Sequence, residues 1–299
     1  MVRGRVISSP AVTPAEAERY QKQAQAEMEA RRRAGKWSAG AKAHTEYASR
    51  PLEWIVKYLE VPEETLRWSM APEYGVADFK WDGDPDPLVT ILEALASWKD
   101  CGVESATGVG KTFLAACIVL WFLACFPDSI VVTVAPKEDQ LLRFVWKELG
   151  RLWGKFHQHF PQAEMLTGLI RMRPAEQDRE VWAAFTMVAG VGAAEEVASK
   201  ARGLHAEHML IITEETPGID AAIMTALDQT RTDDHNLELA LGNPDSEQDE
   251  LHRFCTRQGV VHLRISALDH PNIVTGRRIV PGTIGVQRLE VRTRELVKG

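Results

Sequence analysis

The order of apolar and polar positions changes in character near residue 88. Beyond it, short continuous apolar runs, typical of buried strands, alternate with longer segments whose apolar residues recur at helical spacing. The runs predict strands near residues 101–105, 130–135, 183–189, 209–213, 238–241 and 260–265, with an edge strand at 165–172. The longer segments predict helices over 88–98, 111–125, 137–153, 219–230 and 247–257. This alternation favours an α/β fold with a mostly parallel central sheet flanked by helices.

The segment before residue 88 differs in composition. Residues 1–49 are rich in Ala, Glu, Gln, Lys and Arg and predict an exposed helical arm, and residues 50–80 predict two short amphipathic helices separated at Pro62. Trp54 and Trp68 are the expected packing anchors of these helices. The acidic, turn-rich stretch DGDPDP then marks a boundary. We therefore expect an N-terminal helical arm and lead-in at 1–84, an α/β domain at 85–285 and the start of a linker at 286–299.

Charge and cysteine content exclude several classes of protein. The 35 Lys and Arg against 42 Asp and Glu give a formal charge of −7, which argues against a surface that is basic throughout. The four cysteines show no CxxC spacing, so we expect a reducing compartment and no disulfide framework. The most apolar run, Phe113 to Phe126, is too short to span a bilayer and predicts a buried helix, so no membrane association is expected.

The stretch ESATGVGKT at 104–112 carries the first candidate chemistry. It follows a short apolar strand and precedes a buried helix, which is the context of a phosphate-binding loop of the Walker A type. Lys111 could reach the β and γ phosphates and the Thr112 hydroxyl could bind Mg²⁺. The pattern G-x-x-x-x-G-K-[ST] has Ser in place of its first Gly, and the alternative is a chance GKT at a helix start. The candidate nucleotide-binding residues are Ser105, Ala106, Thr107, Gly108, Val109, Gly110, Lys111 and Thr112.

Two further strand ends carry polar groups that such a site requires. The apolar strand in MLIITEETPGID ends in two acids, of which Glu214 is the candidate Mg²⁺ ligand and Glu215 the candidate general base or water-orienting residue. The strand in ELALGNPDS ends at Asn243, whose amide could sense the γ-phosphate. Each signal has a plain alternative, because paired acids often lie in a solvated loop and Asn-Pro is a common turn.

Two histidine pairs could suggest a metal. His157 and His159 form an HxH, and His205 and His208 an HxxH, but neither pair has a companion Cys or His at a convincing spacing. The structural interpretation is therefore favoured for both pairs.

Taken in order, ESATGVGKT, VVTVAPKEDQLLRFVWKEL, GLHAEHMLIITEETPGI and LGNPDS resemble the N-terminal ATPase domain of phage terminase large subunits. The resemblance covers roughly residues 85–285, which it implies are a phosphate-loop ATPase domain, with the start of a linker to a nuclease domain at 286–299. It implies a phosphate-loop NTPase fold of the ASCE, RecA-like class that uses ATP and Mg²⁺. It further implies a motor that moves double-stranded viral DNA into a procapsid, acting in the host cytoplasm as a homo-oligomeric ring at the portal protein with a small terminase subunit.

Carried over residue by residue, the resemblance implies roles for particular side chains. Lys111 and Thr112 would bind phosphate and metal, Glu214 would take the place of the usual metal-site Asp, and Glu215 would match the catalytic glutamate of Walker B. Asn243 falls in the coupling motif, and Arg202 is the candidate arginine finger for a neighbouring subunit's ATP.

The sequence also departs from the family. Glu104 stands where many relatives carry an arginine, which puts an arginine acting in cis in doubt, and LVTILEAL after Pro87 lacks the glutamine that often reads adenine. The chain stops at Gly299, where the family's nuclease would begin, so no DNA cleavage is expected from it. Two alternatives stay open: a helicase-like DNA-dependent ATPase, and a non-hydrolysing nucleotide-binding scaffold for assembly.

Overall fold

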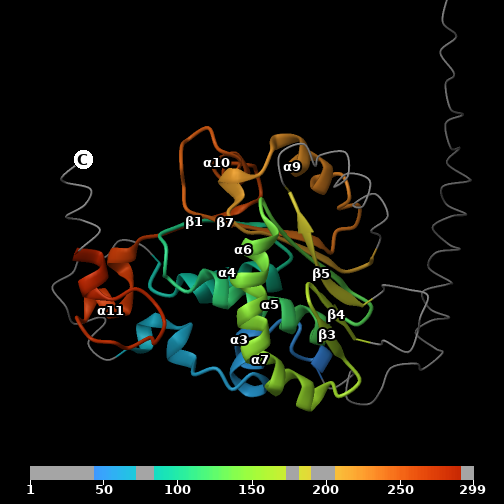
Figure 1. Cartoon of the computed structure of the whole chain (residues 1–299), viewed down its shortest axis with the longest axis horizontal. Helices are drawn as coiled ribbons and strands as arrows, with labels where there is room; N and C mark the ends of the chain where they lie inside the picture. Colours follow the sequence, from blue (N-terminus) through green and yellow to red (C-terminus); the bar gives the residue numbers. More distant parts are fainter. Residues whose placement is uncertain (1–43, 72–83, 173–181, 190–205, 291–299) are drawn as a thin grey trace, which may run out of the picture.

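Eight strands form one sheet in the order β3-β4-β5-β2-β6-β7-β1-β8 (Figure 1). The computed structural model describes residues 44–71, 84–172, 182–189 and 206–290. Pairing from β5 across to β8 is parallel, and the β3–β4 and β4–β5 pairs at one edge are antiparallel. The strands are β1 Cys101–Ser105, β2 Ile130–Ala135, β3 Glu164–Leu166, β4 Leu169–Arg171, β5 Ala183–Val188, β6 Met209–Thr213, β7 Asn236–Gly242 and β8 Val261–Ile265.

Helices cover both faces of this sheet (Figure 1). They are α3 Pro51–Tyr58, α4 Pro87–Ala96, α5 Lys111–Cys125, α6 Glu138–Arg143, α7 Val145–His159, α9 Ala221–Asp228, α10 Glu250–Cys255 and α11 Pro271–Val274. Successive residues of one strand enter different cores: Leu210 and Ile212 pack with α3, α4, α5 and α7, whereas Met209 and Ile211 pack with α9 and α10. Side chains of a strand alternate between its two faces, so burial on both sides requires the continuous apolar runs seen in the sequence.

The two strands that precede the candidate site residues are not neighbours in the sheet. β1 precedes the phosphate-loop sequence and β6 precedes the two glutamates, and β7 lies between them, paired with both. Because the three strands are parallel, their carboxyl ends meet at one edge of the sheet. This arrangement confirms the predicted α/β phosphate-loop fold with a mostly parallel sheet.

Two predicted elements differ from those observed. The single helix expected over 137–153 is wrong: it is two helices, interrupted at Phe144, whose backbone (φ −110°, ψ −79°) leaves helical geometry. The single edge strand expected at 165–172 is instead a hairpin, β3 and β4, which turns at Gly168 with a φ of 71°. Both errors are local interruptions that the period of apolar residues does not reveal.

The segment before residue 84 joins the main core where it is described. Trp54 and Trp68 are buried, as expected for packing anchors, and belong to the same apolar cluster as α5. The predicted arm at 1–43 lies outside the described residues, and the three-part division of the chain stays a prediction. All four cysteines are buried and free. Among the described helices, none has the length and apolar character to cross a membrane.

Candidate functional site

The predicted phosphate-binding loop connects β1 to α5. Ser105 is the last residue of β1 and pairs with Ile265 of β8, so a strand residue, rather than a turn, occupies the position where the motif has its first Gly. This pairing explains why Ser is tolerated there. Gly108 and Gly110 adopt φ values of 86° and 98°, in the left-handed region that glycine enters without strain. Helix α5 then begins at Lys111, and a helix N-terminus is a favourable place for phosphate.

Lys111 connects the loop to the end of β7. Its Nζ donates a hydrogen bond of 2.6 Å to Oδ1 of Asn243, and Nδ2 of Asn243 donates one of 2.7 Å to Oγ1 of Thr107. The amide of Asn243 therefore contacts both the lysine and the loop. Since an ammonium group carries three donors, Lys111 can keep this bond and still contact an anion.

The two glutamates follow β6 on the other side of β7. Glu214 extends the pairing of β6, since its N–H donates to the carbonyl of Val134 at 2.8 Å, and its side chain is buried. Glu215 adopts a left-handed backbone (φ 52°, ψ 43°), which costs a residue other than glycine roughly 1–3 kcal/mol. The Thr216 hydroxyl lies within hydrogen-bonding distance of the Thr213 and Leu241 carbonyl oxygens, at 3.0 and 2.9 Å. These contacts hold the strained turn.

Burial and neighbouring charges shift the pKa values of Glu214 and Lys111 in opposite directions. Burial raises the pKa of Glu214 to about 8, although the ammonium of Lys111 opposes that shift. Burial likewise lowers the pKa of Lys111, and the carboxylates of Glu214 and Glu215 oppose it. Oε1 of Glu214 is buried and has no hydrogen-bond partner among the described residues. Such an oxygen, in the same pocket as the Thr112 hydroxyl, fits a divalent cation with oxygen ligands.

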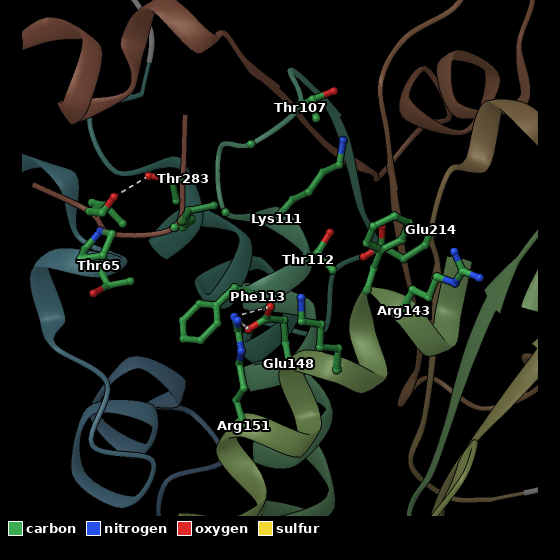
Figure 2. Close-up of a pocket in the computed structure, with 18 of the residues that line it drawn as sticks. Thr65, Thr107, Lys111, Thr112, Phe113, Arg143, Glu148, Arg151, Glu214 and Thr283 are labelled. Carbon is green, nitrogen blue, oxygen red and sulfur yellow. Dashed lines mark hydrogen bonds and ion pairs between the residues drawn. The ribbon is translucent and has the colours of Figure 1, made fainter. Parts of the chain in front are cut away.

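A pocket of about 470 Å³ opens above the loop and α5 (Figure 2). Of the predicted residues, Thr107, Gly108, Gly110, Lys111, Thr112, Glu214 and Glu215 line it. Val109 instead is fully buried in the core, and Ser105 and Ala106 do not line the pocket. The structure thus brings together residues that follow β1 and β6, and Asn243, directly after β7, contacts them through Lys111.

The residues that form the other walls of the pocket were not predicted from the sequence. One wall comes from α6 and α7 and includes Arg143, Phe144, Lys147, Glu148 and Arg151, of which Glu148 and Arg151 form an ion pair below Phe113 (Figure 2). Phe144 is 56% exposed although it is aromatic. An exposed aromatic residue beside cationic residues can indicate a binding surface. The sequence did not show that Phe144 is exposed, because the helix break at this residue was not predicted.

The other wall is a segment far along the chain, Val280 to Ile284. Its Ile284 N–H donates to the Gly108 carbonyl at 2.8 Å, so it covers the phosphate-loop sequence. Asn272 holds this segment in place, because its Nδ2 lies 2.9–3.0 Å from the Val280 carbonyl, the Thr283 hydroxyl and the Ile284 carbonyl. No motif in the sequence indicated this wall.

Four other residues singled out in the sequence do not line the pocket as described. Arg202, the candidate arginine finger, lies outside the described residues, as does His205. Glu104, one residue before Ser105, faces away from the pocket and binds His252, His262 and Arg264. His208 stacks on Phe126, with ring centroids 5.1 Å apart, in agreement with its structural interpretation.

Comparison with known proteins confirms the resemblance drawn from the motifs. The chain is 26% identical over 179 residues to a probable terminase large subunit of Enterobacteria phage P7. The match covers 58% of this chain and 35% of that protein, so the chain spans about a third of its curated relative. No protein-family profile matches the chain.

Solved structures of large terminases are also similar to this chain. The ATPase domain from Thermus phage P74-26 is 16% identical with a TM-score of 0.41, over 56% of this chain and 76% of that one. The large terminase of a thermophilic bacteriophage, in complex with ADP, is 11% identical with a TM-score of 0.43, over 77% of this chain and 48% of that one. At these levels of similarity the fold assignment rests on the strand order of this chain itself.

Proposed function

We propose that this chain hydrolyses ATP in the pocket above α5 and uses the energy to move double-stranded viral DNA into a procapsid. One observation carries the proposal: Lys111, Thr112, Glu214 and Glu215, which follow two strands that are not neighbours, line one pocket. The similarity to a terminase large subunit supports the choice of DNA packaging over other uses of ATP.

The roles proposed for the side chains follow from their positions. The loop N–H groups and the N-terminus of α5 would bind the phosphate oxygens, and Lys111 would neutralise their charge. Glu215 would orient and polarise the attacking water, with its carboxylate held toward the pocket by the strained turn. Asn243 would transmit the state of the phosphates to β7, because it contacts both Lys111 and Thr107.

Magnesium fits the same pocket. The Thr112 hydroxyl and the unpartnered oxygen of Glu214 would hold it. When bound, Mg²⁺ neutralises charge that develops on the transferred phosphoryl group. Glu214 would then be ionised in spite of its burial, because a divalent cation favours the carboxylate form.

The remaining parts of the proposal concern partners. Arg202 of a neighbouring copy would complete the site, so that the active form is a homo-oligomeric ring. That ring would act on duplex DNA at the portal protein, with a small terminase subunit, in the host cytoplasm. The resemblance and the relative's name support these partners.

Steady-state ATP hydrolysis tests the proposal, measured with Mg²⁺, with and without linear duplex DNA, over a range of protein concentrations. We expect turnover per subunit to rise with concentration and with DNA. Lys111→Ala should reduce it by about 100-fold or more, since it removes a charge that stabilises the transition state. Lys155→Ala, which changes an exposed lysine on α7 outside the pocket, is the matched control and should leave turnover unchanged.

A second pair of variants separates binding from hydrolysis. Glu215→Gln should bind ATP with nearly unchanged affinity but hydrolyse it at least about 100-fold more slowly. Glu247→Gln, in an exposed loop, should behave as the parent protein. ATP binding without any turnover, under all conditions, would support the scaffold alternative. If the rate of ATP turnover does not change when DNA is added, the proposed role in DNA packaging is contradicted, although ATP hydrolysis would still be supported.

A further inference from the structure

A cluster of side chains of the types that ligate metals lies around β1, apart from the residues that line the nucleotide pocket. Among the described residues, Glu104, Cys255 and His262 form the cluster in which a carboxylate oxygen, a thiol sulfur and a ring nitrogen all lie within 4.8 Å of one another. They come from β1, α10 and β8, so nothing in the sequence spacing suggests them. This cluster is separate from the two histidine pairs noted in the sequence.

The three side chains are held in place by packing. Glu104 is almost fully buried, with 5% of its side chain exposed, and Oε2 lies 3.0 Å from Nε2 of His262. Cys255 is buried against β1, where a Cβ at Gly102 would come within 2.5 Å of its Sγ. The sulfur of Cys255 fits against β1 because Gly102 has no side chain.

A fourth candidate ligand stands next to the cluster. His252 lies one turn before Cys255 on α10, and residues three apart share a helix face. Its Nδ1 is 2.8 Å from Oε1 of Glu104, the oxygen that does not contact His262. The N-cap Asp249, which accepts from the His252 N–H at 2.8 Å, fixes the start of this helix. His252 can therefore orient the carboxylate or bind a metal itself.

We propose that Glu104, Cys255 and His262 bind a divalent transition metal, with Zn²⁺ the best chemical match, and that His252 supports the carboxylate. Thiolate and imidazole ligands favour Zn²⁺ over Mg²⁺. Ligand atoms of a tetrahedral zinc site lie about 3.5 Å apart at the usual bond lengths of about 2.0–2.3 Å, so side-chain shifts of about an ångström suffice here. The site is distinct from the pocket above α5 and does not depend on the proposed ATPase activity.

A metal ion could reach the cluster from solvent, and its binding would affect the structure around β1. A surface pocket is lined by Asp84, His252, Thr256, His262, Leu263 and Arg264 and gives solvent a path to the cluster. Arg264 donates to Oε2 of Glu104 at 2.7 Å, and its side chain is 70% exposed, so it can turn toward water when a cation binds. Bound metal would connect α10 and β8 to β1, directly before the phosphate-loop sequence, and stabilise that end of the sheet.

Titration of the chelator-treated full chain with Co²⁺ tests this proposal, because Co²⁺ replaces Zn²⁺ and gives a thiolate-to-metal absorption band only when sulfur is a ligand. We expect one equivalent to produce the band and Zn²⁺ to abolish it by displacement. Cys255→Ser should remove the band, whereas Cys125→Ala, which changes a buried cysteine at the end of α5, should retain it. A parent protein that shows no band, or a band that persists in Cys255→Ser, would overturn the proposal.

A second measurement does not depend on the folding of the cysteine variant. Zn²⁺ should raise the melting temperature of the parent protein by several degrees, since a ligand that binds only the folded state stabilises it. His262→Gln, at a side chain that is 27% exposed, should abolish this rise, and His252→Gln should weaken Zn²⁺ binding about 10- to 100-fold as the loss of a supporting contact. An equal rise in the parent protein and in His262→Gln would contradict the assignment.

Discussion

The ammonium of Lys111 donates a hydrogen bond of 2.6 Å to the side-chain oxygen of Asn243. The two residues are 132 positions apart and lie at the ends of neighbouring elements, the loop after β1 and the strand β7. The contact couples the residue proposed to bind phosphate to the strand that separates the loop from the two glutamates.

Substitutions of Asn243 should distinguish charge from position at this contact. Asn243→Asp places a carboxylate beside Lys111 and close to any bound phosphate, so we expect the dissociation constant for ATP to rise about tenfold or more. Asn243→Ala adds no charge and should change affinity little, but lower kcat about tenfold because Lys111 and Thr107 lose their shared partner. Fluorescence titration and steady-state kinetics measure both quantities. Equal affinities for the two variants would contradict this account.

Thr216 is expected to hold the turn that presents Glu215. Thr216→Val keeps the shape of the side chain but removes its contacts with the Thr213 and Leu241 carbonyls. We expect a loss of about 1–3 kcal/mol in the free energy of unfolding, together with a lower kcat. Thr216→Ser retains the hydroxyl and should restore most of both. Urea unfolding and ATP turnover provide the measurements, and a Val variant as stable and active as the parent would refute the role.

Close packing at the end of β7 should make Gly242 intolerant of any side chain. A Cβ there would lie 2.6 Å from Cδ of Pro217, in a ring that cannot rotate away. Gly242→Ala should therefore destabilise the fold by about 1–3 kcal/mol. Gly150→Ala, on α7 with nothing within 4 Å of the added carbon, is the matched control and should stabilise by about 0.5–1 kcal/mol. Thermal unfolding of both variants tests the pair, whose shifts should have opposite signs.

A buried ion network at the start of β7 should be sensitive to the loss of its cation. Arg231 donates twice to Asp100 at 2.7 Å and lies 3.7 Å from Glu238, whose side chain is 1% exposed. Burial raises the pKa of Glu238 to about 7, against the attraction of Arg231. Arg231→Met should cost about 3–5 kcal/mol because it leaves the buried carboxylate of Glu238 without its cation. Adding Glu238→Met should recover most of that loss, and denaturant unfolding of both variants and of the double variant would show whether it does.

The stability of the fold should fall as the pH decreases from 6.5 to 4. Burial lowers the pKa of His270 to about 4, from an ordinary value near 6.5. Between these values the unfolded chain binds the proton and the folded chain does not, so this residue lowers the free energy of unfolding by up to about 3 kcal/mol as the pH falls. His270→Asn preserves a cap for α11 and should remove this part of the pH dependence of unfolding, while His44, whose pKa burial also lowers to about 4, should keep its own part. His157→Asn, at an exposed side chain, serves as the control for a histidine substitution elsewhere in the chain.

Much of the fold could be predicted from local pattern. The runs at 101–105, 130–135 and 209–213 coincide with β1, β2 and β6, because strands buried on both faces are continuously apolar. Helix α5 was expected over its full observed length because a helix buried on all sides is also continuously apolar. The loop residues and the two glutamates could be proposed from the sequence because each group is contiguous and directly follows a buried strand.

Contacts across the fold required the tertiary structure. Periodicity identifies the type of an element but not its neighbours in the sheet, so it could not show that β7 lies between β1 and β6 or that Asn243 meets Lys111. The same reason hid the wall at Val280 to Ile284, and the meeting of Glu104 with Cys255 and His262. In each case the side chains converge only because parallel strands bring distant segments to one place.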